Sequence, residues 1–208
     1  MRVEPRRRLG AAAAAVAKVA FAVIAALGLA AGTGSARAQP RPETLTACAA
    51  CHGADGNAPV AAFPSLAGQP AVFIENQLVL IREGLRDVPA MKQVMAGMGD
   101  PEIVALARHY AAQKVRQPPL AFQADKQRQG AQLADRLLCG SCHLPSFAGQ
   151  NQVPRLAAQN EAFLLLSMKE FRDRPGPGRD TIMAATLRGL SDAELDQLAH
   201  YLAGFKAP

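Results

Sequence analysis

Two short motifs hold every cysteine of the chain and two of its four histidines. They are residues 48–52, with the sequence CAACH, and residues 139–143, with the sequence CGSCH. Cys-x-x-Cys-His is the attachment signature of c-type haem. Residues three apart share a face of a helix, so both sulfurs can reach the two vinyl groups along one haem edge. The histidine that follows then lies under the ring and offers a nitrogen to the iron.

The motifs therefore predict two covalently bound haem c groups. The predicted thioether-forming residues are Cys48, Cys51, Cys139 and Cys142. The predicted iron ligands that follow them are His52 and His143. A single Cys-x-x-Cys could instead be a redox dithiol or half of a zinc site, and cysteines of an exported protein could pair as disulfides. Two complete motifs in similar surroundings favour haem over these alternatives.

The surroundings of the two motifs repeat along the chain, which indicates two similar units. After each motif come a loop and the pattern Pro-x-Leu-Ala-small-Gln, at residues 64–69 and 154–159. Segments whose apolar residues follow the helical period come next, at residues 71–82 and 161–172. We therefore expect a helix in each of these two segments.

Each half closes on a further helix, and a short linker joins the two halves. The closing helices begin near Asp100 and Asp192, which are the predicted N-caps. Gln117-Pro118-Pro119-Leu120 is typical of a stiff connection. A helix over residues 125–139 is expected to lead into the second motif, whereas only a short helix can precede the first.

The first 38 residues have the pattern of a cleavable export signal. Basic residues come first, an apolar run covers residues 19–31, and Ala36-Arg37-Ala38 is an A-x-A cleavage site. The run is shorter than the roughly 20 residues of a membrane-spanning helix, so an uncleaved anchor is the weaker alternative. We predict a signal peptide at 1–38 and a periplasmic protein with domains at 39–117 and 118–208, of which 118–121 is linker.

The export signal also accounts for most of the net charge of +6. Six of the 23 basic and one of the 17 acidic residues lie in it, which leaves 17 basic and 16 acidic side chains. No basic stripe interleaved with aromatic residues remains in this balanced chain, so we expect no nucleic-acid partner.

The ligand on the other side of each iron decides whether a haem carries electrons or binds a substrate. The side chains able to serve are Met91, Met95, Met98, Met168, Met183, His109 and His200. When Asp100 is aligned with Asp192, Met91 falls on Met183, Met95 and Met98 fall on leucines, and neither histidine is repeated. Met168 falls on Leu78 when the preceding segments 71–82 and 161–172 are aligned. We therefore predict Met91 and Met183 as axial ligands, and packing or helix-surface roles for the rest.

Pro64 and Pro154 follow the two histidines at similar distances along the chain. An iron-bound histidine normally donates its other ring N–H to a fixed acceptor, and a loop carbonyl at these prolines could accept it. A rigid turn with no such bond explains the prolines equally well.

These features together resemble the di-haem cytochrome c4 family. The resemblance rests on the paired haem motifs, the segment at 64–69 with its relative at 154–159, and the paired methionines before an Asp-x-Glu helix. It implies an all-α fold of two tandem cytochrome c domains around a pseudo-twofold axis. It also implies His52/Met91 and His143/Met183 ligation, with the carbonyls of Pro64 and Pro154 orienting the histidines. Ala158, where the first half has a glycine, departs from the pattern.

The family implies electron transfer in the periplasm, often towards a terminal oxidase. We expect a carrier rather than an enzyme, with redox proteins as electron donor and acceptor, and peripheral association with a membrane complex is compatible with this role. One alternative is a cytochrome subunit of a dehydrogenase complex. A weaker one is a di-haem enzyme, a peroxidase or a thiosulfate-oxidising cytochrome, because such chemistry needs an open iron.

Overall fold

The computed structural model describes residues 39–207. The predicted signal peptide and its cleavage site lie outside these residues. Within them the regular structure is helical, and the β-type pairing is one isolated bridge between Gln150 and Val153. No helix in this part of the chain is long and apolar enough to cross a membrane. The predicted all-α fold class is confirmed.

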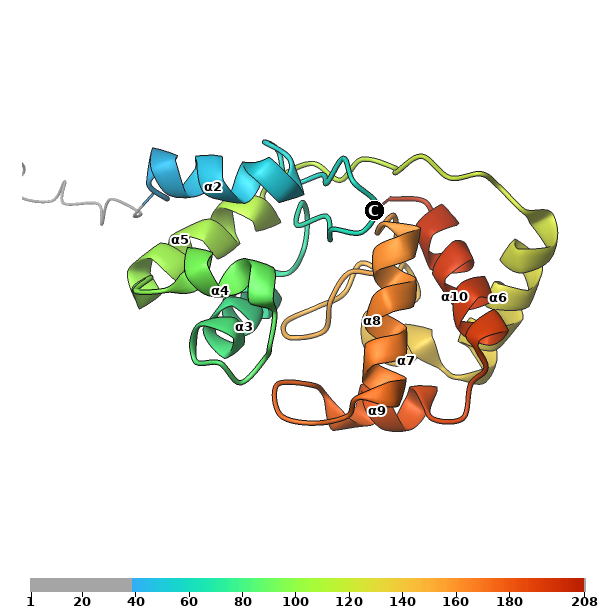
Figure 1. Ribbon diagram of the computed structural model, residues 1–208. Coiled ribbons are helices and arrows are strands. Elements are labelled where there is room, and N and C mark those ends of the chain that lie inside the picture. Colours follow the sequence, from blue (N-terminus) through green and yellow to red (C-terminus); the bar gives the residue numbers. More distant parts are fainter. Residues whose placement is uncertain (1–38, 208) are drawn as a thin grey trace, which may run out of the picture. The chain divides into compact units, whose positions relative to one another are not determined.

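The helices of the first half are α2 (Pro42–His52), α3 (Ala71–Arg82), α4 (Pro89–Met95) and α5 (Asp100–Ala111). They are blue to green in Figure 1, where α3 lies against α5. The bounds of α3 are those predicted from its apolar period. Proline in the first turn of α2, α4 and α5 has the backbone angle of a helix start and lacks an N–H that would stay unbonded there.

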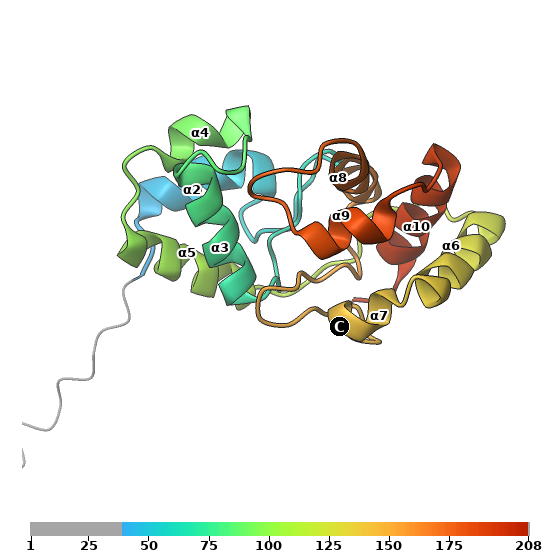
Figure 2. The same cartoon turned by 90° about the horizontal axis from the view of Figure 1, so that it is seen from below.

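The helices of the second half are α6 (Ala124–Arg136), α7 (Cys139–His143), α8 (Glu161–Asp173), α9 (Thr181–Leu187) and α10 (Asp192–Gly204). Figures 1 and 2 show α10 packed against both α6 and α8. Gly130 of α6 permits this approach, because a Cβ atom there would lie 2.2 Å from the carbonyl oxygen of Gln197.

The predicted helix over residues 125–139 is wrong at its end. α6 stops at Arg136, and Leu138 has a φ of 55°, in the left-handed region. A leucine there cannot continue a right-handed helix, so the chain turns before α7 begins at Cys139. In the first half, by contrast, α2 runs without a break through the haem motif.

The predicted N-caps are also displaced by one residue. Gly99 and Ser191 are the caps of α5 and α10, and each aspartate is the first residue inside its helix. Ser191 accepts a hydrogen bond from the backbone N–H of Glu194 and forms a capping box with it. The Asp100 and Asp192 carboxylates instead accept hydrogen bonds from basic side chains of α3 and α8, at 2.7 Å.

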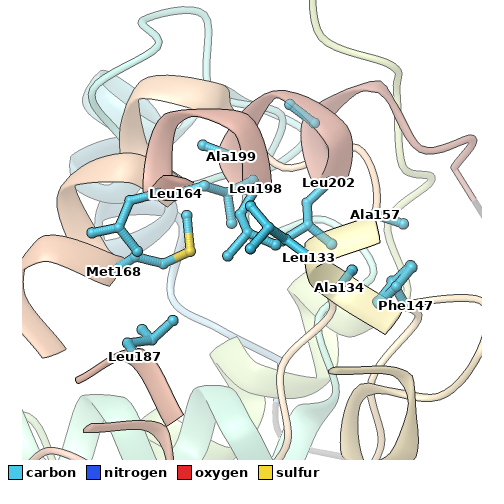
Figure 3. Packing of buried hydrophobic residues seen from close by; sticks show 12 residues of the cluster. Leu133, Ala134, Phe147, Ala157, Leu164, Met168, Leu187, Leu198, Ala199 and Leu202 are labelled. Carbon is cyan, nitrogen blue, oxygen red and sulfur yellow. The ribbon is translucent and has the colours of Figure 1, made fainter. Parts of the chain in front are cut away.

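Each half has its own apolar cluster. The first cluster includes Ile74, Met95, Met98 and Leu106, and the second includes Leu133, Leu164, Met168 and Leu198. Figure 3 shows the second cluster, where side chains from α6, α8, α9 and α10 gather. Met95, Met98 and Met168 are buried in these clusters, which agrees with the packing role predicted for them.

Candidate haem sites

The first site is built by the last turns of α2 and the loop that follows. Cys48, Cys51 and His52 lie on these turns. His52 is 6 % exposed, and its Nδ1 donates a hydrogen bond of 2.9 Å to the carbonyl oxygen of Pro64. Burial lowers the pKa of His52, and the bond to Pro64 offsets this in part. The neutral ring carries its proton on Nδ1, so Nε2 is the nitrogen that can bind iron.

The second site repeats this arrangement on a shorter helix. Cys139, Cys142 and His143 lie on α7. His143 is 4 % exposed, and its Nδ1 donates to the carbonyl oxygen of Pro154, again over 2.9 Å. Burial lowers the pKa of His143, while the bond to Pro154 and the charge of Asp180 act in the opposite direction.

The two halves contain equivalent pairs of cysteine thiols. All four are free; Cys48 and Cys139 are partly buried against the apolar clusters, whereas Cys51 and Cys142 are exposed. Burial raises the pKa of the Cys48 and Cys139 thiols, and a hydrogen bond with Tyr110 offsets part of the effect at Cys48. Two free thiols and one available imidazole nitrogen in each half match the protein bonds that haem c requires.

Met91 and Met183 lie at the edges of the two apolar clusters and are half-buried. Each lies near the start of a short helix, α4 or α9. The Asp180 side chain caps α9 by accepting a hydrogen bond of 2.9 Å from the backbone N–H of Met183. The two methionines therefore occupy corresponding places in the two halves, each close to the cluster that also contacts a motif cysteine.

The two remaining histidines have different surroundings. Both ring nitrogens of His200 are occupied: Gln123 N donates to Nε2 over 3.0 Å, and Nδ1 donates to Glu161 Oε1 over 2.9 Å. His200 therefore connects α10 to the starts of α6 and α8, which is a packing role. His109 is half-buried on α5 and lies beside Gln113 of the following turn.

Two protein-family models match the chain. The model for cytochrome c matches residues 127–206, and the model for subunit III of cbb3-type cytochrome c oxidase matches residues 38–109. Each match contains one complete Cys-x-x-Cys-His motif. The helical fold and the two sites thus define a c-type cytochrome with two cytochrome c domains and two covalently bound haem c groups.

Known relatives narrow this class. Cytochrome c4 of Pseudomonas aeruginosa is 31 % identical over 166 residues, which cover 76 % of this chain and 83 % of that protein. The crystal structure of reduced cytochrome c4 from Pseudomonas stutzeri matches with a TM-score of 0.71 and 26 % identity, over 81 % of this chain and 100 % of that one. The chain belongs to the di-haem cytochrome c4 family, a family of electron-transfer proteins.

A further relative carries a more specific name. The thiosulfate dehydrogenase electron acceptor of Stutzerimonas stutzeri is 34 % identical over 173 residues, with 76 % of this chain and 78 % of that protein covered. Redox proteins are therefore the class of partner for this chain, as predicted.

Sequence reasoning missed several buried polar residues between the two sites. They are Ser65, Gln69, Arg155, Gln159 and Asn160, all of which are almost fully buried. The repeated Pro-x-Leu-Ala-small-Gln pattern marked the positions of Gln69 and Gln159, but their partners lie 86 and 94 residues away along the chain.

Proposed function

We propose that this protein is a periplasmic one-electron carrier in which both irons are closed by a histidine and a methionine. One observation carries the proposal: the same set of groups recurs in both halves. Each half has a buried histidine with Nδ1 committed to a proline carbonyl, and a half-buried methionine at the edge of the adjoining apolar cluster. A closed iron favours electron transfer over substrate binding.

The haem groups supply the one-electron chemistry, and the residues of the chain hold and tune them. In this proposal His52 and Met91 bind one iron, and His143 and Met183 bind the other. A soft thioether ligand stabilises ferrous iron and raises the reduction potential. The carbonyls at Pro64 and Pro154 fix the ring orientation and make the bound imidazole a stronger donor.

The domain and export assignments are part of the same proposal. We place the first cytochrome c domain at residues 39–117 and the second at 118–208, with 118–121 as linker. The absence of any apolar cluster shared by the two halves of the described chain supports this division. Periplasmic export through cleavage after Ala38 is consistent with covalent haem attachment to thiols.

A second candidate function is that of a cytochrome subunit, which binds a dehydrogenase and accepts electrons from it. The relative named for thiosulfate dehydrogenase favours it, and so do two exposed apolar side chains. Leu138 is 70 % exposed beside Cys139, and Ile182 is 68 % exposed beside Met183. Apolar side chains next to haem-binding residues suit a docking face for a redox partner.

Carbon monoxide binding to the purified, dithionite-reduced protein tests the main proposal, with haem content determined on the same sample. We expect two haems per chain and no spectral change with carbon monoxide, because methionine closes both irons. Binding at one haem would contradict the carrier function and indicate a di-haem enzyme.

Reduction by a thiosulfate dehydrogenase tests the second candidate. We expect the double variant Leu138→Ala/Ile182→Ala to be reduced more slowly than the parent protein. Replacing two exposed residues of the first half, Val60→Ala and Val72→Ala, is the matched control. Equal rates in all three proteins, or no reduction of the parent, would remove this candidate.

A further inference from the structure

Two glutamine side chains connect the halves of the molecule in a reciprocal way. The carboxamide of Gln69 accepts a hydrogen bond from the backbone N–H of Arg155 and donates one to the carbonyl oxygen of the same residue, both at 2.9 Å. The carboxamide of Gln159 binds Ser65 in the same manner, at 2.7 Å to its N–H and 2.9 Å to its carbonyl. Each half therefore holds one loop residue of the other half by both backbone groups.

The residues held in this way directly follow the two prolines that bind the histidines. The Pro64 carbonyl and the Ser65 N–H belong to one planar peptide group. Its oxygen accepts from His52 Nδ1 at 2.9 Å, and its N–H donates to Gln159 Oε1 at 2.7 Å. The peptide group between Pro154 and Arg155 is bound in the same way by His143 and Gln69.

Hydrogen bonds at the two ends of one peptide group strengthen each other. When an N–H donates, electron density moves towards the carbonyl oxygen, which becomes a better acceptor. A better acceptor draws the histidine N–H proton more strongly and raises the basicity of the ring as an iron ligand. The glutamine of one half can thus influence the histidine of the other.

We propose that Gln159 is a positioning residue for His52, that Gln69 is a positioning residue for His143, and that each half thereby tunes the haem of the other. The inference rests on the axial roles proposed above for the two histidines. The arrangement is enclosed, because Ser65, Gln69, Gln159 and Arg155 are almost fully buried, so water does not compete for these bonds. The Arg155 guanidinium adds a hydrogen bond of 3.0 Å to Ala67 O and holds the same loop of the first half.

The test is a pair of substitutions, Gln159→Leu and Gln69→Leu, which remove the carboxamide at nearly constant volume. We expect Gln159→Leu to raise the midpoint reduction potential of the haem bound by His52 and to leave the other unchanged. Gln69→Leu is expected to do the reverse. The loss of basicity weakens the ligand's stabilisation of ferric iron, which sets the upward direction.

Asn160→Leu is the matched control. Asn160 Nδ2 donates to Phe63 O over 2.8 Å, so this residue also joins the halves but does not bind the peptide group between Pro64 and Ser65. A general loosening of the contact between the halves would make Asn160→Leu shift the potentials as Gln159→Leu does. If either leucine variant fails to fold, the shorter Gln→Asn substitution at the same position replaces it. This variant is expected to raise the reduction potential of the same haem.

Met91→His and Met183→His assign the spectroscopic signals of the two haems. Each variant is expected to remove the methionine-ligated spectrum of one haem. If neither variant changes a haem spectrum, the axial assignments fail, and with them the proposed function. The cross-domain inference is wrong if the assignments hold but Gln159→Leu shifts both reduction potentials equally or shifts neither. It is also wrong if Gln159→Leu shifts only the potential of the haem bound by His143.

Discussion

The two halves carry the same proposed haem-binding groups but differ in the exposed side chains next to them. Position 138, just before the second motif, is an exposed leucine, and the corresponding position 47 in the first half is an exposed alanine. Ile182, just before Met183, likewise corresponds to Ala90 before Met91. The second half therefore exposes larger apolar side chains next to its motif and next to its proposed methionine ligand.

The halves also differ in the charge that each places at their contact. Arg155 of the second half is 1 % exposed, and the corresponding residue in the first half is Ser65. Burial lowers the pKa of Arg155 to about 10, so its guanidinium is still charged at neutral pH. It donates to the carbonyl oxygens of Ser65, Ala67 and Ala157 rather than to a carboxylate. A haem-binding fold can thus be duplicated while the contact between the copies becomes asymmetric.

The largest expected effect comes from removing one methionine at a time. Met91→Ala and Met183→Ala each open one iron, so the reduced variant is expected to bind carbon monoxide at half of its haems. The measurement is a carbon monoxide difference spectrum normalised to haem content. An unchanged spectrum in either variant would show that its methionine is not a ligand, and Met168→Ala, which alters a buried core residue, is the control.

Removing the buried Arg155 side chain is expected to destabilise the protein more than truncating Ser65, the corresponding residue of the first half. Arg155→Ala loses charge-assisted hydrogen bonds to the first half, and we expect a loss of roughly 2–4 kcal/mol in the free energy of unfolding. Ser65→Ala loses one hydrogen bond, from Ala58 N to Ser65 Oγ at 3.1 Å, and is expected to lose about 1 kcal/mol. Urea unfolding followed by circular dichroism compares them, and equal losses would contradict the asymmetry.

A smaller difference in stability is expected for substitutions at Gly68 and Ala158, which occupy corresponding turns of the two halves. Gly68 has a φ of 62° and Ala158 a φ of 53°, so both backbones are left-handed. Gly68→Ala adds a Cβ atom 2.4 Å from Val115 Cγ2 and is expected to destabilise by about 1–3 kcal/mol. Ala158→Gly relieves strain but loses a buried methyl group, so we expect a change below about 1 kcal/mol. Thermal unfolding distinguishes the two, and a tolerated Gly68→Ala would overturn this view of the turn.

The smallest expected effect is a dependence of stability on pH in the first half. Burial alone would raise the pKa of Glu102, but hydrogen bonds from Arg41 N and from the Thr44 hydroxyl, with the charge of Arg41, bring it below its usual 4.5. This stabilisation is present above pH 4.5 and is lost as the pH falls through the lower folded-state pKa.

Glu102→Gln is therefore expected to cost less than about 1 kcal/mol at neutral pH, and the difference from the parent should close in acid. The check is the melting temperature of both proteins from neutral pH to below pH 4.5. Glu194→Gln is the comparison in the second half, because hydrogen bonds from Ser191 in the capping box, together with Arg136, also lower the pKa of Glu194. A difference between parent and Glu102→Gln that persists in acid would rule out this origin.

Local patterns in the sequence were enough for the haem motifs, the helical class and the core methionines. Residues 48–52 and 139–143 specify haem attachment through spacing alone, and the apolar period of 71–82 set the bounds of α3. The alignment of Met91 with Met183 predicted an axial pair, which stays a prediction. The haem motifs and the helical period depend on neighbours within a few turns of one chain segment, whereas the methionine assignments came from comparing the two repeats.

Tertiary structure decided the features that depend on distant neighbours. The pairing of the Asp100 and Asp192 carboxylates with basic side chains depends on where α3 and α8 pack. The cap at Ser191, by contrast, belongs to a local capping box with Glu194. The crossed bonds of Gln69 and Gln159 join residues 86 and 94 positions apart. No local pattern reveals such bonds, because a carboxamide can bind any backbone group that folding brings to it, and here folding brought the peptide groups that hold the two histidines.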